Sequence, residues 1–156
     1  MIIIQDTREQ KPWDFSFYDE CEKQVIRTVK TGDYTIEGLE DKICIERKRN
    51  SSEIAFNLGQ KYKPFERELE RMRSFTFKYI ICEFPHHLLD IFPKESGMPI
   101  YKQKYSKISG NFIKSKINKI TDEYGIEFIF CQNSFKAQEK AIEIFTEKYN
   151  VLKEQA

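Results

Sequence analysis

The stretch GDYTIEGLEDKICIERKRNSSE, residues 32–53, combines the pattern of a β-hairpin with a group of acidic and basic residues. Two short runs rich in Ile and Tyr, 34–37 and 43–47, flank a turn and predict an antiparallel β-hairpin. In a strand, residues two apart point to the same face, so Glu46 and Lys48 project together. The second run therefore continues into charged residues, whereas an ordinary strand ends at its last apolar residue.

The start of the hairpin brings a second acid to the same place. Antiparallel pairing sets the beginning of one strand beside the end of the next, so Asp33 is expected close to Glu46. Two carboxylates at that range repel unless a cation lies between them, and their hard oxygens suit Mg²⁺ or Mn²⁺. Lys48 is placed to hold a water or to neutralise charge on a phosphate. The arrangement is typical of metal-dependent phosphodiesterases; a solvated hairpin with alternating charges is the alternative.

Length and composition allow one domain with its own core. The chain has 156 residues, of which 40% are hydrophobic and 14% aromatic, and its net charge of +1 does not by itself indicate a nucleic-acid partner. Its four cysteines lie far apart with no CxxC pair, which favours buried free thiols over a zinc site. The first ten residues resemble neither a signal peptide nor a membrane span. We therefore expect a cytoplasmic or nucleoid-associated protein that is not secreted and has no membrane partner.

Strand and helix patterns alternate after the hairpin. Strands are expected at 2–5, 24–29, 34–37, 43–47, 78–83 and 126–131. Ser51 or Ser52 is expected to cap a helix, which Gly59 and Pro64 divide into a short and a longer piece. Further helices are expected at 108–124 and 134–152. This order predicts an α/β fold with a mixed central β-sheet flanked by helices in a single domain.

Three motifs occur in a fixed order: DTREQ at 6–10, GDY at 32–34 and IERK at 45–48. Together they resemble the nuclease domain of the XPF-type structure-specific endonucleases, and similarity continues to the final helix. The resemblance implies a restriction-endonuclease-like fold and a single nuclease domain over 1–156, without a helix-hairpin-helix or helicase region. It also implies Mg²⁺- or Mn²⁺-dependent hydrolysis of phosphodiester bonds in branched, flapped or forked DNA.

The same resemblance assigns roles to five residues. Asp33 and Glu46 match the family's metal-binding acids, and Lys48 matches its catalytic lysine. Asp6 and Arg8 match an Asp-x-Arg at the start of the domain. Asp6 is then expected as a further metal ligand, and Arg8 as a bidentate phosphate ligand. The alternative for these two is a buried pair that fixes the loop.

Four further positions are less specific. Arg47 matches the middle of the ERK motif, with its backbone carbonyl expected on the metal and its side chain facing away. The family's last acid falls at Ser52, but the acid here is Glu53. That residue either reaches the site from the helix's first turn or caps the helix. Glu9 and Glu83 follow other strands and face either the same cleft or solvent.

A basic run lies between residues 96 and 121, where there is no Asp or Glu. It contains Lys102, Lys104, Lys107, Lys114, Lys116 and Lys119, with Tyr101 and Tyr105 interleaved. Such a run predicts a surface that follows phosphates, or else a solvated helix face. Glycine and proline within it indicate a mobile loop at 94–107 that closes on the substrate.

The sequence leaves two other functions open. One is a non-catalytic DNA-binding or scaffold subunit of a nuclease dimer. The other is a restriction-type or RNA-processing nuclease with the same metal chemistry. Besides DNA, the expected partner is a second nuclease domain, in a homodimer or a heterodimer.

Overall fold

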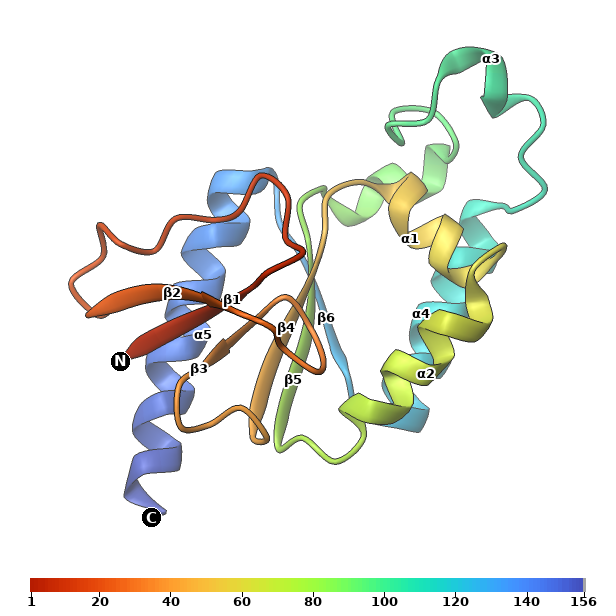
Figure 1. Ribbon diagram of the computed structural model, residues 1–156. Helices are drawn as coiled ribbons and strands as arrows, with labels where there is room; N and C mark the ends of the chain where they lie inside the picture. Colours follow the sequence, from red (N-terminus) through yellow and green to blue (C-terminus); the bar gives the residue numbers. More distant parts are fainter. Residues whose placement is uncertain (156) are drawn as a thin grey trace.

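The strand that carries the ERK motif lies inside a six-stranded sheet. The computed structural model describes residues 1–155 (Figure 1). The strands are β1 (Ile2–Asp6), β2 (Lys23–Arg27), β3 (Tyr34–Ile36), β4 (Ile43–Lys48), β5 (Phe77–Cys82) and β6 (Glu127–Phe130). They follow the order β2-β1-β3-β4-β5-β6. Strand β3 pairs antiparallel with β1 and β4, and the remaining pairs are parallel. The predicted mixed sheet is thus confirmed.

Helices cover both faces of this sheet. They are α1 (Ser51–Leu58), α2 (Tyr62–Met72), the 3₁₀ helix η1 (His86–Ile91), α3 (Ile100–Gln103), α4 (Gly110–Tyr124) and α5 (Ser134–Glu154). Helices α1, α2 and α4 lie on one side, α5 lies on the other, and α3 projects away from the body (Figure 1). The sequence did not predict η1 or α3. No helix within residues 1–155 has the length and apolar character needed to span a membrane.

The alternation of β4 divides the core in two. Cys44 packs with the apolar stripe of α1, α2 and α4. Ile43 and Ile45 pack on the opposite face, against α5 and the aromatic loop that follows β1. All six residues of β4 are buried, because neighbours lie on both edges and helices on both faces. Its charged end is therefore enclosed by protein.

The start of α1 differs from the prediction. The helix is capped by Asn50, whose side chain accepts a hydrogen bond from the backbone N–H of Glu53 at 2.9 Å. Ser51 and Ser52 are already helical. The predicted break at Gly59 is correct, but Pro64 breaks nothing. It lies in the first turn of α2, where its missing N–H has no intrahelical partner to lose.

Gly32, just before β3, has a left-handed backbone conformation that is unfavourable for residues with a side chain. Its φ is +81°, and a Cβ at this position would lie 3.1 Å from the carbonyl oxygen of Ile45. We expect Gly32→Ala to lower the free energy of unfolding by more than the roughly 1–2 kcal/mol of a left-handed conformation alone. Urea unfolding measures the loss. Gly38→Ala is the matched control, because Gly38 has a φ of +88° but open space around it. Equal losses would contradict the close approach.

Candidate active site

Two acids meet at the junction of β3 and β4. The backbone N–H of Asp33 donates to the carbonyl of Ile45 at 2.8 Å, and the backbone N–H of Arg47 donates to the Asp33 carboxylate at 2.7 Å. These bonds aim the side chain of Asp33 at Glu46, and the two carboxyl groups are in hydrogen-bonding contact. The structure therefore brings together the two acids whose proximity the hairpin predicted.

Burial changes the protonation of this pair. It raises the pKa of Glu46 to about 8, and the negative charge of Asp33 adds to the effect. Burial also raises the pKa of Asp33, although contacts with Glu46, the Arg47 N–H and Lys48 oppose it. The pair thus retains a proton near neutral pH unless a cation replaces it.

A third acid, Glu68 on α2, completes the group and was missed in the sequence. Its carboxyl group contacts that of Glu46, and burial raises its pKa to about 8. A signal was present: Glu68 stands on the helix stripe formed by Phe65, Leu69 and Met72, where an acid is out of place. The acids border a cavity of about 210 Å³ lined by Asp6, Arg8, Lys30, Gly32, Asp33, Glu46, Glu68 and Arg71.

Lys48 is the cation that acts most strongly on Glu46 and Glu68. Its side chain is 5% exposed, and its ammonium lies 5.2 Å from the centre of the Phe65 ring. Burial lowers the pKa of Lys48, but the surrounding carboxylates, with Glu46 the strongest, raise it above its usual value. The side chain therefore stays protonated beside the acid pair.

The donor set suits a hard divalent cation. Within residues 1–155, no three Asp, Glu, His or Cys side chains are already arranged around one point as metal ligands. Mg²⁺ normally takes only one or two carboxylates and fills its shell with water and substrate phosphate. Asp33 and Glu46 offer such a partial shell. A bound cation would take the place of the proton that the pair retains, because both supply the positive charge that relieves the repulsion of the two carboxylates.

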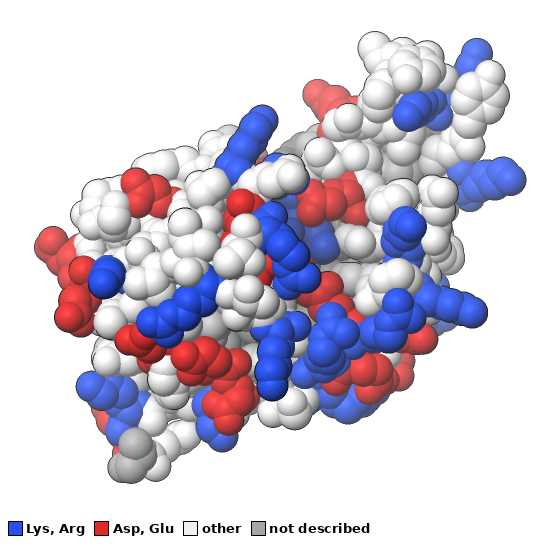
Figure 2. All heavy atoms as spheres, in the orientation of Figure 1, with Lys and Arg blue, Asp and Glu red and all other residues white. Residues whose placement is uncertain are grey.

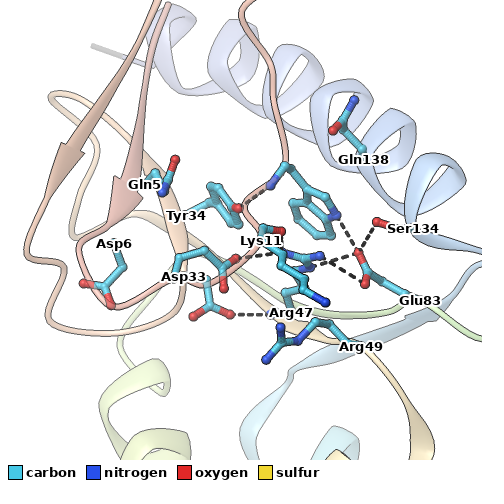
Figure 3. A network of polar contacts seen from close by, with 12 residues as sticks. Gln5, Asp6, Lys11, Asp33, Tyr34, Arg47, Arg49, Glu83, Ser134 and Gln138 are labelled. Carbon is cyan, nitrogen blue, oxygen red and sulfur yellow. Dashed lines mark hydrogen bonds and ion pairs between the residues drawn. The ribbon is translucent and has the colours of Figure 1, made fainter. Parts of the chain in front are cut away.

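Asp6 has other partners. One oxygen of its carboxylate accepts from the backbone N–H of Val29 at 2.9 Å, and the other accepts from the Arg8 guanidinium at 2.9 Å. Burial raises the pKa of Asp6, but these hydrogen bonds outweigh it and lower the value overall. Figure 3 shows Asp6 on the far side of Asp33 from Arg47. Asp6 is buried but the Arg8 side chain is 73% exposed, so the two form a half-exposed pair at the cavity wall rather than the buried pair of the alternative. Asp6 as a metal ligand stays a prediction.

Arg47 points to the opposite face of the sheet, as expected. Its guanidinium forms ion pairs with Glu83 at 2.9 Å and Glu9 at 3.3 Å, and it lies 5.1 Å from the centre of the Trp13 ring (Figure 3). Glu83 also accepts from the indole N–H of Trp13 and from the hydroxyl of Ser134. Glu83 therefore lies neither in the cleft nor in solvent, so both of its expected placements were wrong. Glu9 is also largely enclosed, but its charge helps to raise the pKa of Asp33, so it lies close to the acid pair.

Glu53 forms its contacts next to the N-cap of α1, but the cap itself is Asn50. Its carboxylate accepts from the backbone N–H of Arg49 at 3.1 Å and lies 3.7 Å from the Arg49 guanidinium. This contact satisfies a free N–H just before the start of α1. Glu53 is nevertheless among the carboxylates that raise the pKa of Lys48, so it borders the site without joining the acid pair.

The predicted lysine surface separates into two parts. Lys102, Lys104 and Lys107 are exposed on and after α3. Lys114 instead forms an ion pair with Asp90, and Lys116 lies over the Tyr62 ring at 4.9 Å. Figure 2 shows Lys and Arg side chains on the projecting segment and over α2, with acidic side chains in the hollow between.

The raised carboxyl pKa values predict how stability depends on pH without divalent cations. Glu46 and Glu68 stay protonated in the folded protein between about pH 4.5 and 8, whereas they ionise in the unfolded chain. The folded state then binds more protons, so the free energy of unfolding falls as pH rises through this window. Urea unfolding in EDTA at several pH values measures the slope.

Glu46→Gln should flatten this slope, because its amide does not ionise. Glu66→Gln, on the exposed side of α2, serves as the control and should leave the slope unchanged. Stability that is constant or rises over the window in the wild type would contradict the assignment.

Breaking the Arg47 network predicts a large loss of stability. Arg47→Met leaves Glu83 buried without its cation, and removal of one partner of a buried ion pair costs about 3–5 kcal/mol. Adding Glu83→Gln should recover part of the loss. Lys136→Ala, which removes the exposed pair with Glu139, is the control and should have little effect. Urea unfolding compares the variants, and a small effect of Arg47→Met would refute the role of the network.

Comparisons with known proteins agree with this architecture. XPF from Aeropyrum pernix superposes with a TM-score of 0.67 at 19% identity over 99% of this chain and 68% of the other. The XPF from Aeropyrum pernix in complex with DNA gives 0.63 at 21% identity, over 96% and 64% of the two chains. No curated protein sequence matches. The family model of the ERCC4 domain matches residues 5–139, and the chain therefore belongs to the ERCC4 domain family.

Proposed function

We propose that this chain is a divalent-metal-dependent DNA endonuclease that hydrolyses phosphodiester bonds in branched, flapped or forked DNA. The observation that carries the proposal is the buried contact of the Asp33 and Glu46 carboxyl groups beside the protonated Lys48. Three ionisable groups are costly to enclose unless function or a ligand requires them. Membership of the ERCC4 domain family, and a fold shared with a DNA-bound XPF, support the same conclusion.

Each residue of the site has a chemical role in this proposal. Asp33 and Glu46 hold the cation, with Glu68 next to them on α2. When bound, Mg²⁺ neutralises charge on the phosphate and activates a water. Lys48 orients that water or stabilises the negative charge that develops as the phosphate is attacked. Arg8, whose side chain is 73% exposed, lies on the cavity wall where it can bind a neighbouring phosphate.

A cleavage panel tests the proposal. Labelled flap, fork and plain duplex DNA are incubated with the protein in Mg²⁺, Mn²⁺ or EDTA, and products are resolved on a denaturing gel. We expect cleavage only with a divalent cation and preferentially beside the branch. A protein that binds DNA but cleaves nothing would favour the non-catalytic subunit, and preference for RNA would favour an RNA-processing nuclease.

Two substitutions separate metal binding from catalysis. Lys48→Met should keep the acids and bind Mg²⁺, yet reduce the cleavage rate by about 100-fold or more, because it removes charge stabilisation from the reacting phosphate. Asp33→Asn should lose both cleavage and metal affinity, measured by calorimetry. Cleavage that survives Asp33→Asn would exclude this site. Lys63→Met, an exposed lysine on α2, controls for loss of surface charge. Dimer formation stays a prediction.

A further inference from the structure

The segment between η1 and α4 exposes apolar and aromatic side chains at its tip. Ile100 is 86% exposed, Tyr101 is 68% exposed and Tyr105 is 71% exposed. The ammonium of Lys102 lies 5.8 Å from the Tyr101 ring centre, and that of Lys104 lies 5.2 Å from the Tyr105 ring centre. Large exposed aromatics on a projecting element usually mark a binding surface (Figure 1).

This segment is anchored at its base rather than free. The backbone carbonyl of Ser96 accepts from the N–H of Ser52 at 3.0 Å, and Ser96 itself is fully buried. Gly97 has a φ of +86°, and a Cβ there would lie 2.5 Å from the side chain of Asn50. The side chain of Gln103 closes the turn on the carbonyl of Met98 at 3.0 Å. The aromatic tip is thus held above the start of α1.

A groove of about 640 Å³ lies between the segment and α1. Its lining includes the apolar side chains of Phe56, Phe92, Met98, Pro99 and Ile108, and the lysines Lys102 and Lys107. Ser52 and Glu53 lie on its wall, and the side chain of Asn50, two residues after Lys48, lies against Gly97 at its edge, so the groove adjoins the end of β4 that carries the acid site. Apolar walls with basic side chains suit a ligand that carries flat apolar faces and negative charge.

We propose, resting on the proposed function, that this segment and groove bind an unpaired DNA strand next to the cleavage site. Bases stack on Tyr101 and Tyr105 or enter the groove, while the lysines contact the backbone phosphates. A paired duplex keeps its base faces inside the stack, so exposed tyrosines distinguish unpaired from paired DNA. The absence of Asp and Glu from residues 96–121 gives the charge complementarity.

Binding in EDTA tests this without cleavage. Fluorescence anisotropy measures the Kd of the wild type and of Tyr101→Ala/Tyr105→Ala for a labelled single strand, a flap and a blunt duplex. We expect the double variant to bind the single strand and the flap about tenfold more weakly, since base stacking on aromatic residues contributes affinity of this order. Its affinity for the duplex should stay nearly unchanged.

Two matched variants control for packing and for loss of an exposed ring. Tyr101→Phe/Tyr105→Phe keeps the ring faces and should bind like the wild type. Phe17→Ala removes a ring that is 60% exposed outside the groove, and it should have no effect.

Three results would overturn the assignment: unchanged affinity of the double alanine variant, an equal loss on blunt duplex, or tighter binding of an RNA strand of the same sequence. The outcome is separate from that of the proposed function. A wild type that never cleaves but shows the stacking effect overturns only the nuclease proposal. A wild type that cleaves and shows no stacking effect overturns only this one.

Discussion

A central strand that ends in three consecutive charged residues sets the main constraint on this structure. Glu46, Arg47 and Lys48 are only 5–7% exposed, because β4 has strands on both edges and helices on both faces. An enclosed ion costs several kcal/mol unless partners surround it. Because side chains alternate along the strand, Glu46 and Lys48 point toward α1 and α2, and Arg47 points toward α5. One face therefore collects Asp33 and Glu68, and the other collects the acids that pair with Arg47.

Local rules predicted one face of this strand and failed on the other. Alternation and hairpin pairing both act within residues 32–48, so they placed Asp33, Glu46 and Lys48 correctly with respect to one another. Glu83 depends on the register of β5 with β4, in which Lys48 lies opposite Cys82. Glu83, the residue after Cys82, therefore lies on the same face of the sheet as Arg47, toward α5. Residues 32–48 alone do not predict this pairing, because it depends on how β5 aligns with β4. Glu68 likewise depends on how α2 packs on the sheet, although its place on an apolar stripe was a usable signal.

The basic run shows the limit of composition. Read along the chain, its lysines form one continuous surface. In space, Asp90 neutralises Lys114, and the ring of Tyr62 lies under Lys116, although both partners are distant in sequence. Lys102, Lys104 and Lys107 keep their charge exposed beside the tyrosines, and Lys119 is exposed farther along α4. Packing with these distant partners therefore divides the predicted phosphate-binding surface, and one short segment carries both exposed rings and exposed cations.

The end of β4 also fixes that segment relative to the acids. Asn50 follows Lys48 by two residues, and its side chain caps α1 through the N–H of Glu53. The same side chain occupies the space that a Cβ of Gly97 would need, so the base of the projecting segment rests on it. One short stretch of chain thus positions Lys48, the start of α1 and the groove beyond it. A DNA strand held in this groove would reach the acid site at a fixed distance. The reason is that only a few residues of the chain connect Lys48 to the start of α1, so the groove and the acid site move little relative to each other.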